Sequence, residues 1–374
     1  MATVLPPIAV CHMQDPLDPK VWSKTPANVS AALKAVGRLG PAIHGLKHDS
    51  FGMKLRAGLT ALRYGDPFHP RNYLHGASMR AAHAKHIMTQ VEQLGVSHVL
   101  HFSGERYLPL PENYGKVKNY LLIDSSWSYW NRGRKNTKYL SRINSDMRKA
   151  YHQMDHIFSI SEHGRDSLIA DYDIDVSSVS VVGSGPGSMT PYLGPKNYEQ
   201  PFLLFVARDR FKEKGGWLLL SAFEIAKKSI PSLELWIVGP HELAGRLSLI
   251  PGVHYFSNLP FSELEVLFQK ASLFAMPALL EPWGLVYLEA LRCRTPILGL
   301  NRGAIAQISQ NGRFGFIVDG DTPHAVSESI IDALGDPWRL LKMGTEGQAY
   351  SVDYYTWENL VKRMLLFIDG GLFP

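Results

Sequence analysis

Short apolar runs alternate along the whole chain with longer stretches in which apolar residues recur every three or four positions. In the first half the apolar runs lie at residues 8–12, 42–46, 98–102, 120–123, 157–160 and 180–182. In the second half they lie at residues 202–206, 233–238, 253–256, 273–276, 297–300 and 316–318. Because such runs, bounded by turn residues and separated by amphipathic helices, are typical of strands buried on both faces, the pattern predicts an α/β protein with two parallel sheets.

The first predicted helix has a recognisable start. Thr25 precedes Pro26, an order typical of an N-cap followed by proline at the first helical position. Apolar residues then recur at helical spacing, at Val29, Ala32, Leu33 and Val36. We therefore expect all four to be buried in the core.

The length of the chain favours two domains. Single hydrophobic cores stop growing at roughly 250 to 300 residues, and the chain has 374. Glycine and proline replace the periodic pattern between residues 183 and 195, which indicates the boundary. We therefore expect one domain over residues 1–190 and a second over residues 191–355.

Composition excludes several classes of protein. No run of 18 apolar residues is present, and the N-terminus lacks the charged and apolar regions of a signal peptide, so we expect a cytoplasmic protein. The two cysteines, Cys11 and Cys293, lie in apolar segments. They are expected to be reduced core thiols rather than a disulfide or a metal site.

The net charge of +5 is unevenly placed. Residues 1–190 hold 22 Lys and Arg against 15 Asp and Glu, whereas residues 191–374 hold 17 against 19. The excess concentrates in residues 132–149, where Asp146 is the single acid. The basic residues there are Arg132, Arg134, Lys135, Lys138, Arg142, Arg148 and Lys149.

Aromatic residues precede this basic segment, in the run from Trp127 to Trp130. Aromatic side chains beside Lys and Arg suit the headgroup region of an anionic bilayer, with the protein peripheral on the inner membrane face, or a phosphorylated acceptor. The same pattern is typical of a solvated helix face with two core tryptophans. One short basic cluster without a recognised binding module does not support nucleic acid as a partner.

Two glutamates, Glu281 and Glu289, lie in a segment that predicts a strand, a tight turn and a new helix. The backbone N–H groups of Gly284, Leu285 and Val286 have no intrahelical partner at such a helix start, where the aligned peptide dipoles favour a diphosphate. Glu281 is placed to accept hydrogen bonds from sugar hydroxyls, and Glu289 from ribose hydroxyls. The segment therefore predicts a nucleotide-sugar site in which neither glutamate needs to act as an acid or base.

This segment resembles the retaining glycosyltransferases of family 4, whose signature is two glutamates separated by seven residues in a Glu-Pro-aromatic-Gly-Leu context. Upstream, residues 202–216 look like the family's strand that delivers an arginine, here Arg208, and then a lysine before glycine, here Lys214. Downstream, residues 296–303 and 311–318 look like the family's next two strand-and-loop units.

The resemblance implies a fold of the GT-B type, in which two Rossmann-like domains face each other across a cleft. The second domain would bind the donor and the first domain the acceptor. The last amphipathic stretch, within residues 356–374, resembles the family's final helix, which completes the first domain. The implied activity is transfer of a hexose from a UDP- or GDP-sugar to a saccharide or lipid-linked acceptor, in polysaccharide, lipopolysaccharide or glycolipid synthesis.

The resemblance also implies that no metal or other cofactor is required. Arg208 and Lys214 would stabilise the charge that develops on the departing diphosphate, as a metal ion does in other transferases. Candidate metal ligands are Asp171, Asp173, Asp175, His152 and His156. We expect the aspartates to be solvent-facing turn residues, and the two histidines lack a third ligand nearby.

Two candidates stand on the acceptor side, where the family often carries a His or Asp at the end of a first-domain strand. Asp124 follows the predicted strand 120–123, and His101 lies in the predicted strand 98–102. Because the departing phosphate can take the acceptor proton in a front-side transfer, such a residue need only orient the substrates. The alternatives are a helix or turn cap for Asp124 and a satisfied strand-end histidine for His101.

Two positions depart from the family pattern. The loop at residues 12–26 lacks the paired glycines expected near the donor phosphates, so Lys24 could supply charge there, or the loop could serve the acceptor. Gln307 stands where the family often has a glutamate. A second hypothesis is therefore a nucleotide-sugar-binding partner subunit that has lost transfer, although the four charged residues of the donor motif favour an enzyme.

Overall fold

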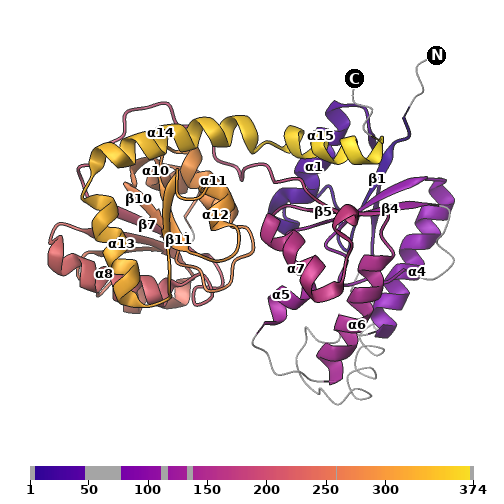
Figure 1. Ribbon diagram of the computed structural model, residues 1–374, viewed down its shortest axis with the longest axis horizontal. Coiled ribbons are helices and arrows are strands. Elements are labelled where there is room, and N and C mark those ends of the chain that lie inside the picture. Colours follow the sequence, from indigo (N-terminus) through magenta and orange to yellow (C-terminus); the bar gives the residue numbers. More distant parts are fainter. Residues whose placement is uncertain (1–4, 47–76, 111–116, 133–137, 258, 371–374) are drawn as a thin grey trace. The chain divides into compact units, whose positions relative to one another are not determined.

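The chain divides into two compact units, shown in Figure 1. The computed structural model describes residues 5–46, 77–110, 117–132, 138–257 and 259–370. One unit comprises Met1–Ser184 with Trp357–Pro374, and the other comprises Gly185–Thr356. The sequence pattern places the corresponding limits at residues 190 and 355.

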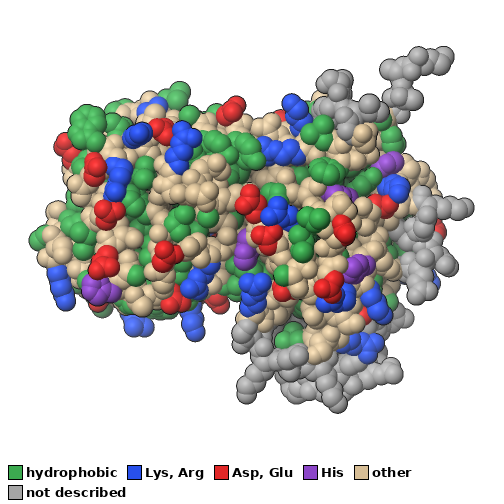
Figure 2. Space-filling view, in the orientation of Figure 1, with side chains coloured by type: hydrophobic (Ala, Val, Ile, Leu, Met, Phe, Trp, Pro, Cys, Tyr) green, Lys and Arg blue, Asp and Glu red, His purple; other side chains and the backbone are tan. Residues whose placement is uncertain are grey.

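Charged side chains of both signs are interspersed with apolar ones on the face shown in Figure 2. Within the described ranges, no helix is both long enough and apolar enough to cross a bilayer. Cys11 and Cys293 are buried free thiols, as predicted, and burial raises the pKa of each to about 12. Neither thiol is therefore a reactive thiolate at neutral pH.

The N-terminal unit contains a parallel six-stranded sheet in the order β2-β1-β3-β4-β5-β6, which confirms the strands predicted for the first half. Its strands are β1 (Ile8–His12), β2 (Leu39–His44), β3 (His98–Phe102), β4 (Lys118–Ile123), β5 (His156–Ser159) and β6 (Val179–Val181). Its described helices are η1 (Trp22–Lys24), α1 (Thr25–Ala35), α4 (Ala77–Leu94), α5 (Trp127–Asn131), α6 (Lys138–His152), α7 (Glu162–Tyr172), η2 (Val176–Ser178) and α15 (Trp357–Ile368).

The second strand begins earlier than its apolar run indicates. β2 starts at Leu39, whereas the run predicts residues 42–46. The sequence pattern misses this start because residue 40 is glycine, a residue that is depleted in strands. It is needed there for packing, since a Cβ on Gly40 would lie 2.8 Å from backbone atoms of Ile8 and Ala9 on β1.

α1 differs from its prediction at both ends. The helix begins at Thr25 itself and follows Lys24 in a left-handed conformation, so Thr25 is not an N-cap. The helix ends at Ala35, which leaves Val36 52% exposed. The other three apolar residues of the predicted stripe are buried, and the expectation that Val36 joins them is wrong.

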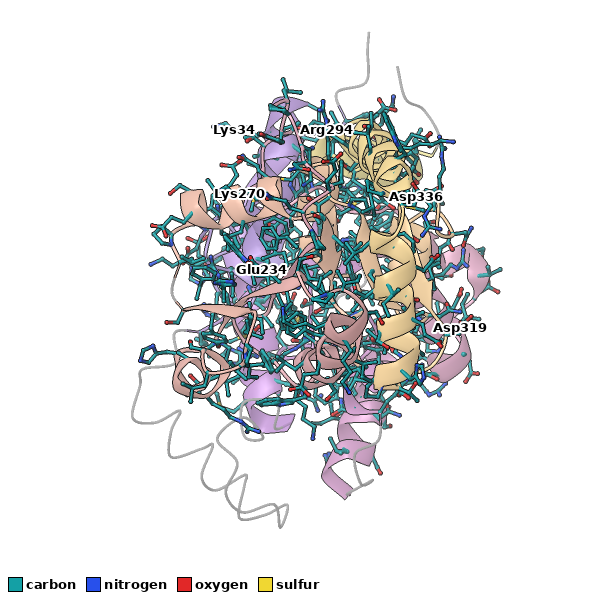
Figure 3. All side chains as sticks on the ribbon, turned by 90° about the vertical axis from the view of Figure 1, so that its left-hand side faces the viewer. Lys34, Glu234, Lys270, Arg294, Asp319 and Asp336 are labelled. Carbon is teal, nitrogen blue, oxygen red and sulfur yellow. The ribbon has the colours of Figure 1, made fainter. Side chains whose placement is uncertain are left out.

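The C-terminal unit contains a second parallel six-stranded sheet, in the order β12-β11-β10-β7-β8-β9. Its strands are β7 (Phe202–Val206), β8 (Glu234–Gly239), β9 (Val253–Ser257), β10 (Leu273–Ala275), β11 (Ile297–Leu300) and β12 (Gly315–Val318). Its described helices are α8 (Gly216–Ser229), η3 (His241–Leu243), α9 (Ala244–Leu247), α10 (Phe261–Lys270), α11 (Leu285–Arg292), α12 (Ile305–Ile308), α13 (Pro323–Leu334) and α14 (Pro337–Tyr354). Asp336, labelled in Figure 3, caps α14 by accepting the backbone N–H of Arg339 at 2.9 Å.

Each sheet has a point at which the strand order reverses. In the first sheet β1 lies between β2 and β3, and in the second β7 lies between β8 and β10. In open α/β sheets, ligands bind outside the carboxyl ends of the strands at such a switch point. The loops after β1 and β3, and those after β7 and β10, are therefore where binding sites are expected.

The last helix, α15, belongs to the N-terminal unit and lies beside α1 (Figure 1). Asp369, just after α15, accepts both guanidinium nitrogens of Arg38, at 2.5 and 3.0 Å. Arg363 on α15 donates to the carbonyl oxygen of Val182 at 2.8 Å. Both contacts anchor the end of the chain to the first sheet's unit.

Candidate active site

Gly284 ends the turn between β10 and α11 with a φ of 84°, in the left-handed region where glycine is favoured. A Cβ there would lie 2.7 Å from the Tyr287 ring. That ring is fixed, because the Tyr287 hydroxyl donates to the carbonyl oxygen of Met276 at 2.6 Å. α11 begins at Leu285, so the predicted helix start is confirmed, and its first N–H groups, on Leu285 and Val286, have no intrahelical partner.

Two cations converge on the carboxylate of Glu281, which precedes this helix start. Arg210 Nη2 lies 3.2 Å from Glu281 Oε2 and also donates to the carbonyl oxygen of Leu280 at 2.8 Å. Lys214 Nζ lies 3.9 Å from the same carboxylate oxygen. The side chains of Glu281 and Lys214 are only 14% and 15% exposed, so both groups are held in place.

The loop after β7 is locked onto the loop after β10, which brings these charges together. The carbonyl oxygen of Glu213 accepts the backbone N–H groups of Leu279 and Leu280 at 2.7 and 3.0 Å. Gly215 has a φ of 81°, and a Cβ there would overlap the carbonyl oxygen of Pro277. The close approach of the two loops therefore depends on glycine at position 215.

Of the two predicted cations, the structure brings Lys214 to Glu281 but leaves Arg208 exposed beyond the end of β7. Arg210, which sequence reasoning passed over, occupies the position beside Glu281. Its backbone has a φ of 51°. The signal that could have found it is its spacing of four residues from Lys214, but the family pattern draws attention to Arg208 instead.

Glu289, on the first two turns of α11, lies against the backbone of Gly187 in the same unit. A Cβ on residue 187 would lie 2.7 Å from Glu289 Cδ and 3.0 Å from its Cγ, and would overlap its Oε1. Glycine at that position therefore makes room for the carboxylate. Sequence reasoning assigned residue 187 only to the domain boundary.

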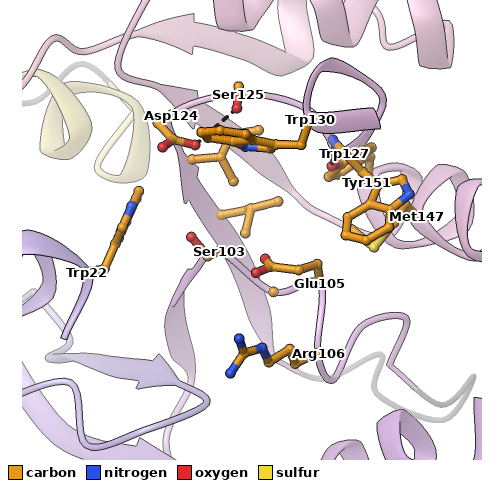
Figure 4. A pocket seen from close by; sticks show the side chains of 13 residues that line it. Trp22, Ser103, Glu105, Arg106, Asp124, Ser125, Trp127, Trp130, Met147 and Tyr151 are labelled. Carbon is orange, nitrogen blue, oxygen red and sulfur yellow. Dashed lines mark hydrogen bonds between the residues drawn. The ribbon is translucent and has the colours of Figure 1, made fainter. Parts of the chain in front are cut away.

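In the N-terminal unit, a hollow of about 310 Å³ opens at the carboxyl ends of β3 and β4 (Figure 4). Asp124, the residue after β4, lines it, and Asp124 Oδ1 accepts from the Ser125 hydroxyl at 3.2 Å. Ser126, rather than Asp124, caps α5. Asp124 therefore lies beside the cap residue and lines the hollow.

His101 does not line this hollow, although it lies on the neighbouring strand β3. Its side chain is fully buried, with Nδ1 3.2 Å from the Tyr107 hydroxyl and Nε2 3.1 Å from Asn119 Oδ1. Burial lowers the pKa of His101 to about 4. Both ring nitrogens of His101 thus have side-chain partners within the protein, as the alternative of a satisfied strand-end histidine expects.

A second hollow, of about 160 Å³, adjoins the first and lies at the switch point between β1 and β3. His12, at the end of β1, lines it, and His12 Nδ1 accepts the backbone N–H of Gln14 at 3.0 Å. Trp22 lines both hollows. The loop at residues 12–26 thus contributes aromatic and polar side chains to this edge of the N-terminal sheet.

The candidate metal ligands are dispersed. Asp171 lies on α7 and accepts from the Ser128 hydroxyl at 2.5 Å, so the expectation of a solvent-facing turn residue is wrong there. His152 donates to the carbonyl oxygen of Tyr172 at 3.0 Å, and His156 lies 2.8 Å from a different partner, the Ser180 hydroxyl. No group of three or more His, Cys, Asp or Glu suited to a metal occurs among the described residues.

Two arginines of the basic segment at residues 132–149 form ion pairs with aspartates outside that segment. Arg132 Nη2 lies 3.6 Å from Asp171 Oδ2, and Arg148 pairs with Asp173. These acids follow the segment in sequence, which is why counting charges within the segment overstated its excess. Such half-exposed pairs reduce the local positive charge that an anionic surface would meet.

The single acid within the segment, Asp146, pairs with the buried guanidinium of Arg80 on α4. Two further members of the segment, Arg134 and Lys135, lie outside the described residues.

Comparisons with known proteins give the site a context. Residues 194–350 match the family model of the glycosyl transferases group 1. A GDP-mannose-dependent alpha-(1-6)-phosphatidylinositol monomannoside mannosyltransferase from Mycolicibacterium smegmatis is 29% identical over 171 residues, which cover 42% of this chain and 45% of that protein. A D-inositol 3-phosphate glycosyltransferase from Corynebacterium urealyticum is 31% identical over 124 residues, which cover 33% of this chain and 29% of that protein. The similarity thus spans less than half the length of either relative.

Solved structures match nearly the whole chain. Sucrose-phosphate synthase from Thermosynechococcus elongatus has a TM-score of 0.71 at 16% identity and covers 98% of this chain and 99% of its own. WaaG, a glycosyltransferase involved in lipopolysaccharide biosynthesis, has a TM-score of 0.67 at 14% identity and covers 97% of this chain and 100% of its own. At these identities the likeness shows the fold. The chain therefore has the GT-B fold, and its residues 194–350 are similar to the glycosyl transferases group 1.

Proposed function

We propose that this protein is a retaining glycosyltransferase that moves a hexose from a UDP- or GDP-sugar to a saccharide or lipid-linked acceptor without a metal ion. The observation that carries the proposal is the position of Glu281 Oε2, 3.2 Å from Arg210 and 3.9 Å from Lys214, just before the start of α11. The match of residues 194–350 to the glycosyl transferases group 1 supports the same class of reaction.

The donor would bind at the carboxyl edge of the second sheet. Its diphosphate would lie against the N–H groups of Leu285 and Val286, where the helix dipole favours negative charge. Glu281 would accept hydrogen bonds from the hydroxyls of the sugar, and Glu289, farther along α11, from those of the ribose. Arg210 holds the Glu281 carboxylate in position for this role.

The transfer would exchange one bond at the anomeric carbon for another on the same face of the sugar. The bond from that carbon to the diphosphate oxygen breaks, and a bond to the acceptor hydroxyl oxygen forms. The hydroxyl proton passes to the departing phosphate oxygen, so no side chain has to act as the base. Lys214, Arg208 and the helix start stabilise the charge that develops on the diphosphate.

The acceptor would bind in the hollow of the N-terminal unit. Asp124 lies at the end of β4 and lines that hollow, so its carboxylate is placed to orient an acceptor hydroxyl. This is a positioning role, because the departing phosphate takes the proton.

Nucleotide binding tests the proposal most simply. Titration of the protein with UDP, GDP and their hexose conjugates, with and without EDTA, should show one nucleotide that binds equally well in both conditions. Lys214→Ala should weaken that binding by about 1.5 to 3 kcal/mol, the cost of a lost charged hydrogen bond. Lys212→Ala, at an exposed position two residues away, is the matched control and should bind as the wild type does.

Two results of this titration would contradict the proposal, and a third would favour the alternative. Binding that EDTA abolishes contradicts the metal-free proposal, and no binding of any nucleotide contradicts the donor site. Nucleotide binding without any turnover of the sugar donor would favour a partner subunit that has lost transfer.

A further inference from the structure

We infer that the acceptor is an uncharged saccharide, bound by the aromatic hollow of the N-terminal unit, and not a phosphorylated sugar or lipid headgroup. The inference rests on the proposed function and deepens it by naming the acceptor class. It is carried by the lining of the two adjoining hollows at the carboxyl ends of β1, β3 and β4.

Aromatic side chains surround the larger hollow. Trp22, Trp127, Trp130 and Tyr151 line it, and Figure 4 shows their rings around a central space. A pyranose ring has apolar C–H faces and polar hydroxyl edges, so it can pack a face on an indole ring while its hydroxyls reach polar groups. A hollow of about 310 Å³ lies within the usual size range of small-ligand sites.

These rings are held in place before any ligand binds. The Tyr151 hydroxyl accepts the backbone N–H of Trp127 at 3.0 Å. Trp130 meets the Tyr129 ring edge-on, with the ring centres 5.8 Å apart. Trp22 has a φ of 39°, a strained backbone conformation for a bulky residue that sits at a ligand-sized hollow. Preorganised aromatic surfaces reduce the entropy lost on binding.

Polar groups complete the lining. Asp124, Glu105 and Ser103 face the larger hollow and provide acceptors for sugar hydroxyls. Glu105 and Arg106 are carried by the turn after β3, where the backbone N–H groups of Tyr107 and Leu108 bond to the Gly104 carbonyl oxygen at 3.0 and 2.8 Å.

The charges of the lining disfavour an anion. Among the lining residues that the structure describes, Arg106 is the one permanent cation, and the same lining carries two carboxyl groups, those of Asp124 and Glu105. Burial raises the pKa of Glu105, and even in its protonated form the lining carries no net positive charge. Burial lowers the pKa of His12 to about 4, so this ring adds no charge at neutral pH. A phosphate would meet one cation and at least one like charge, whereas hydroxyl groups find several acceptors.

The size of the site favours more than one sugar unit. The smaller hollow shares Trp22 and the turn at Ser103–Arg106 with the larger one, and it adds His12 and Gln14 as polar groups. A saccharide that fills the larger hollow can therefore extend over Trp22 towards β1.

The test compares matched acceptors in one assay. Release of nucleoside diphosphate from the preferred sugar donor is measured with the methyl glycosides of glucose, galactose and mannose, and with the 6-phosphates of the same glycosides. At least one neutral glycoside should stimulate release, and its 6-phosphate should be at least roughly tenfold less effective, as expected for about 1.4 kcal/mol of charge repulsion.

Two tryptophan variants connect the result to the hollow. Trp130→Ala should raise the KM for the neutral glycoside at least roughly tenfold without changing the KM for the donor, since it removes an aromatic binding surface worth more than about 1.4 kcal/mol. Trp338→Ala is the matched control, because Trp338 is 80% exposed on α14 in the other unit. Saturable quenching of tryptophan fluorescence by the glycoside should likewise be lost in the first variant and kept in the second.

The inference is overturned if a 6-phosphate matches or exceeds its neutral counterpart, or if Trp130→Ala leaves the acceptor KM unchanged. Nucleotide binding together with no response to any neutral glycoside also overturns it, while the proposed donor site stands. Absence of nucleotide binding would instead remove the proposed function, and the acceptor assignment with it.

Discussion

A single methyl group on residue 187 should displace the carboxylate of Glu289 without unfolding the protein. In Gly187→Ala the new Cβ would lie 2.7 Å from Glu289 Cδ and 3.0 Å from its Cγ, and would overlap Oε1. The overlapped atoms belong to the end of a flexible side chain rather than to the backbone. The carboxylate can therefore turn away at little cost in folding free energy, but it then leaves the position proposed for binding the ribose.

The expected effect on donor binding follows from the bonds that are lost. A hydrogen bond to a charged group contributes about 1.5 to 3 kcal/mol, and about 1.4 kcal/mol corresponds to a tenfold change in Kd. If Gly187→Ala removes one such bond, nucleotide binding should weaken by roughly 10- to 150-fold. If the displaced carboxylate finds no second position near the ribose, the larger value applies.

Isothermal titration with the preferred nucleotide measures this effect directly. Gly245→Ala on α9 is the matched control, because a Cβ there would meet no atom within 4 Å. Thermal unfolding of both variants should show that the fold is kept. Equal Kd values for the two variants, with both folded, would refute the reasoning that the position of Glu289 contributes to donor binding.

Three other substitutions should change the stability or the turnover of the protein. Gly215→Ala should lower the urea unfolding midpoint more than Gly320→Ala, because both residues have a left-handed backbone but, of the two, only residue 215 is packed against other backbone atoms. The control variant Gly320→Ala measures the roughly 1 to 2 kcal/mol cost of a left-handed alanine by itself. Equal midpoints would contradict the packing of the loop after β7 against the loop after β10. Arg210→Ala should reduce donor turnover at least roughly tenfold and Arg210→Lys less, because a cation beside Glu281 orients it; turnover equal to wild type in Arg210→Ala would exclude that role. Because the pKa of His101 is about 4 in the folded protein, the unfolded state binds more protons between pH 6.5 and 4, and stability falls as the pH drops through that window. His101→Gln should remove up to roughly 3 kcal/mol of this fall, as measured by urea unfolding at each pH. An unchanged pH dependence would contradict the burial of a neutral imidazole at position 101.

The sheets and the helix start at Leu285 could be predicted from the sequence because both are encoded locally. Apolar runs bounded by turn residues mark strands that helices cover on both faces, and proline and glycine mark the turn before α11. Local patterns do not predict the bounds of an element or the burial of a residue where these depend on contact with another segment. β2 starts at Leu39 because Gly40 allows β1 to approach, and Val36 is exposed because α1 ends one residue earlier.

Among the candidate site residues, too, some positions follow from the local sequence and others depend on distant segments. The motif around Glu281 is local, and the family pattern singles out Lys214, which meets Glu281 where the loop after β7 contacts the loop after β10. The positions of Arg210 and His101 depend on loop conformation and strand order, which the sequence does not display. β3 lies between β1 and β4, and this central place in the sheet is what buries the imidazole of His101.

The central claim is that the Glu281 carboxylate, held by Arg210 and Lys214, binds the donor sugar for transfer. It is tested most directly by comparing turnover and nucleotide binding in Glu281→Gln with those in Glu263→Gln, an exposed position on α10. We predict that Glu281→Gln loses nearly all release of nucleoside diphosphate from the sugar donor while it still binds the free nucleotide, and that Glu263→Gln behaves as wild type. Full turnover in Glu281→Gln would contradict the account.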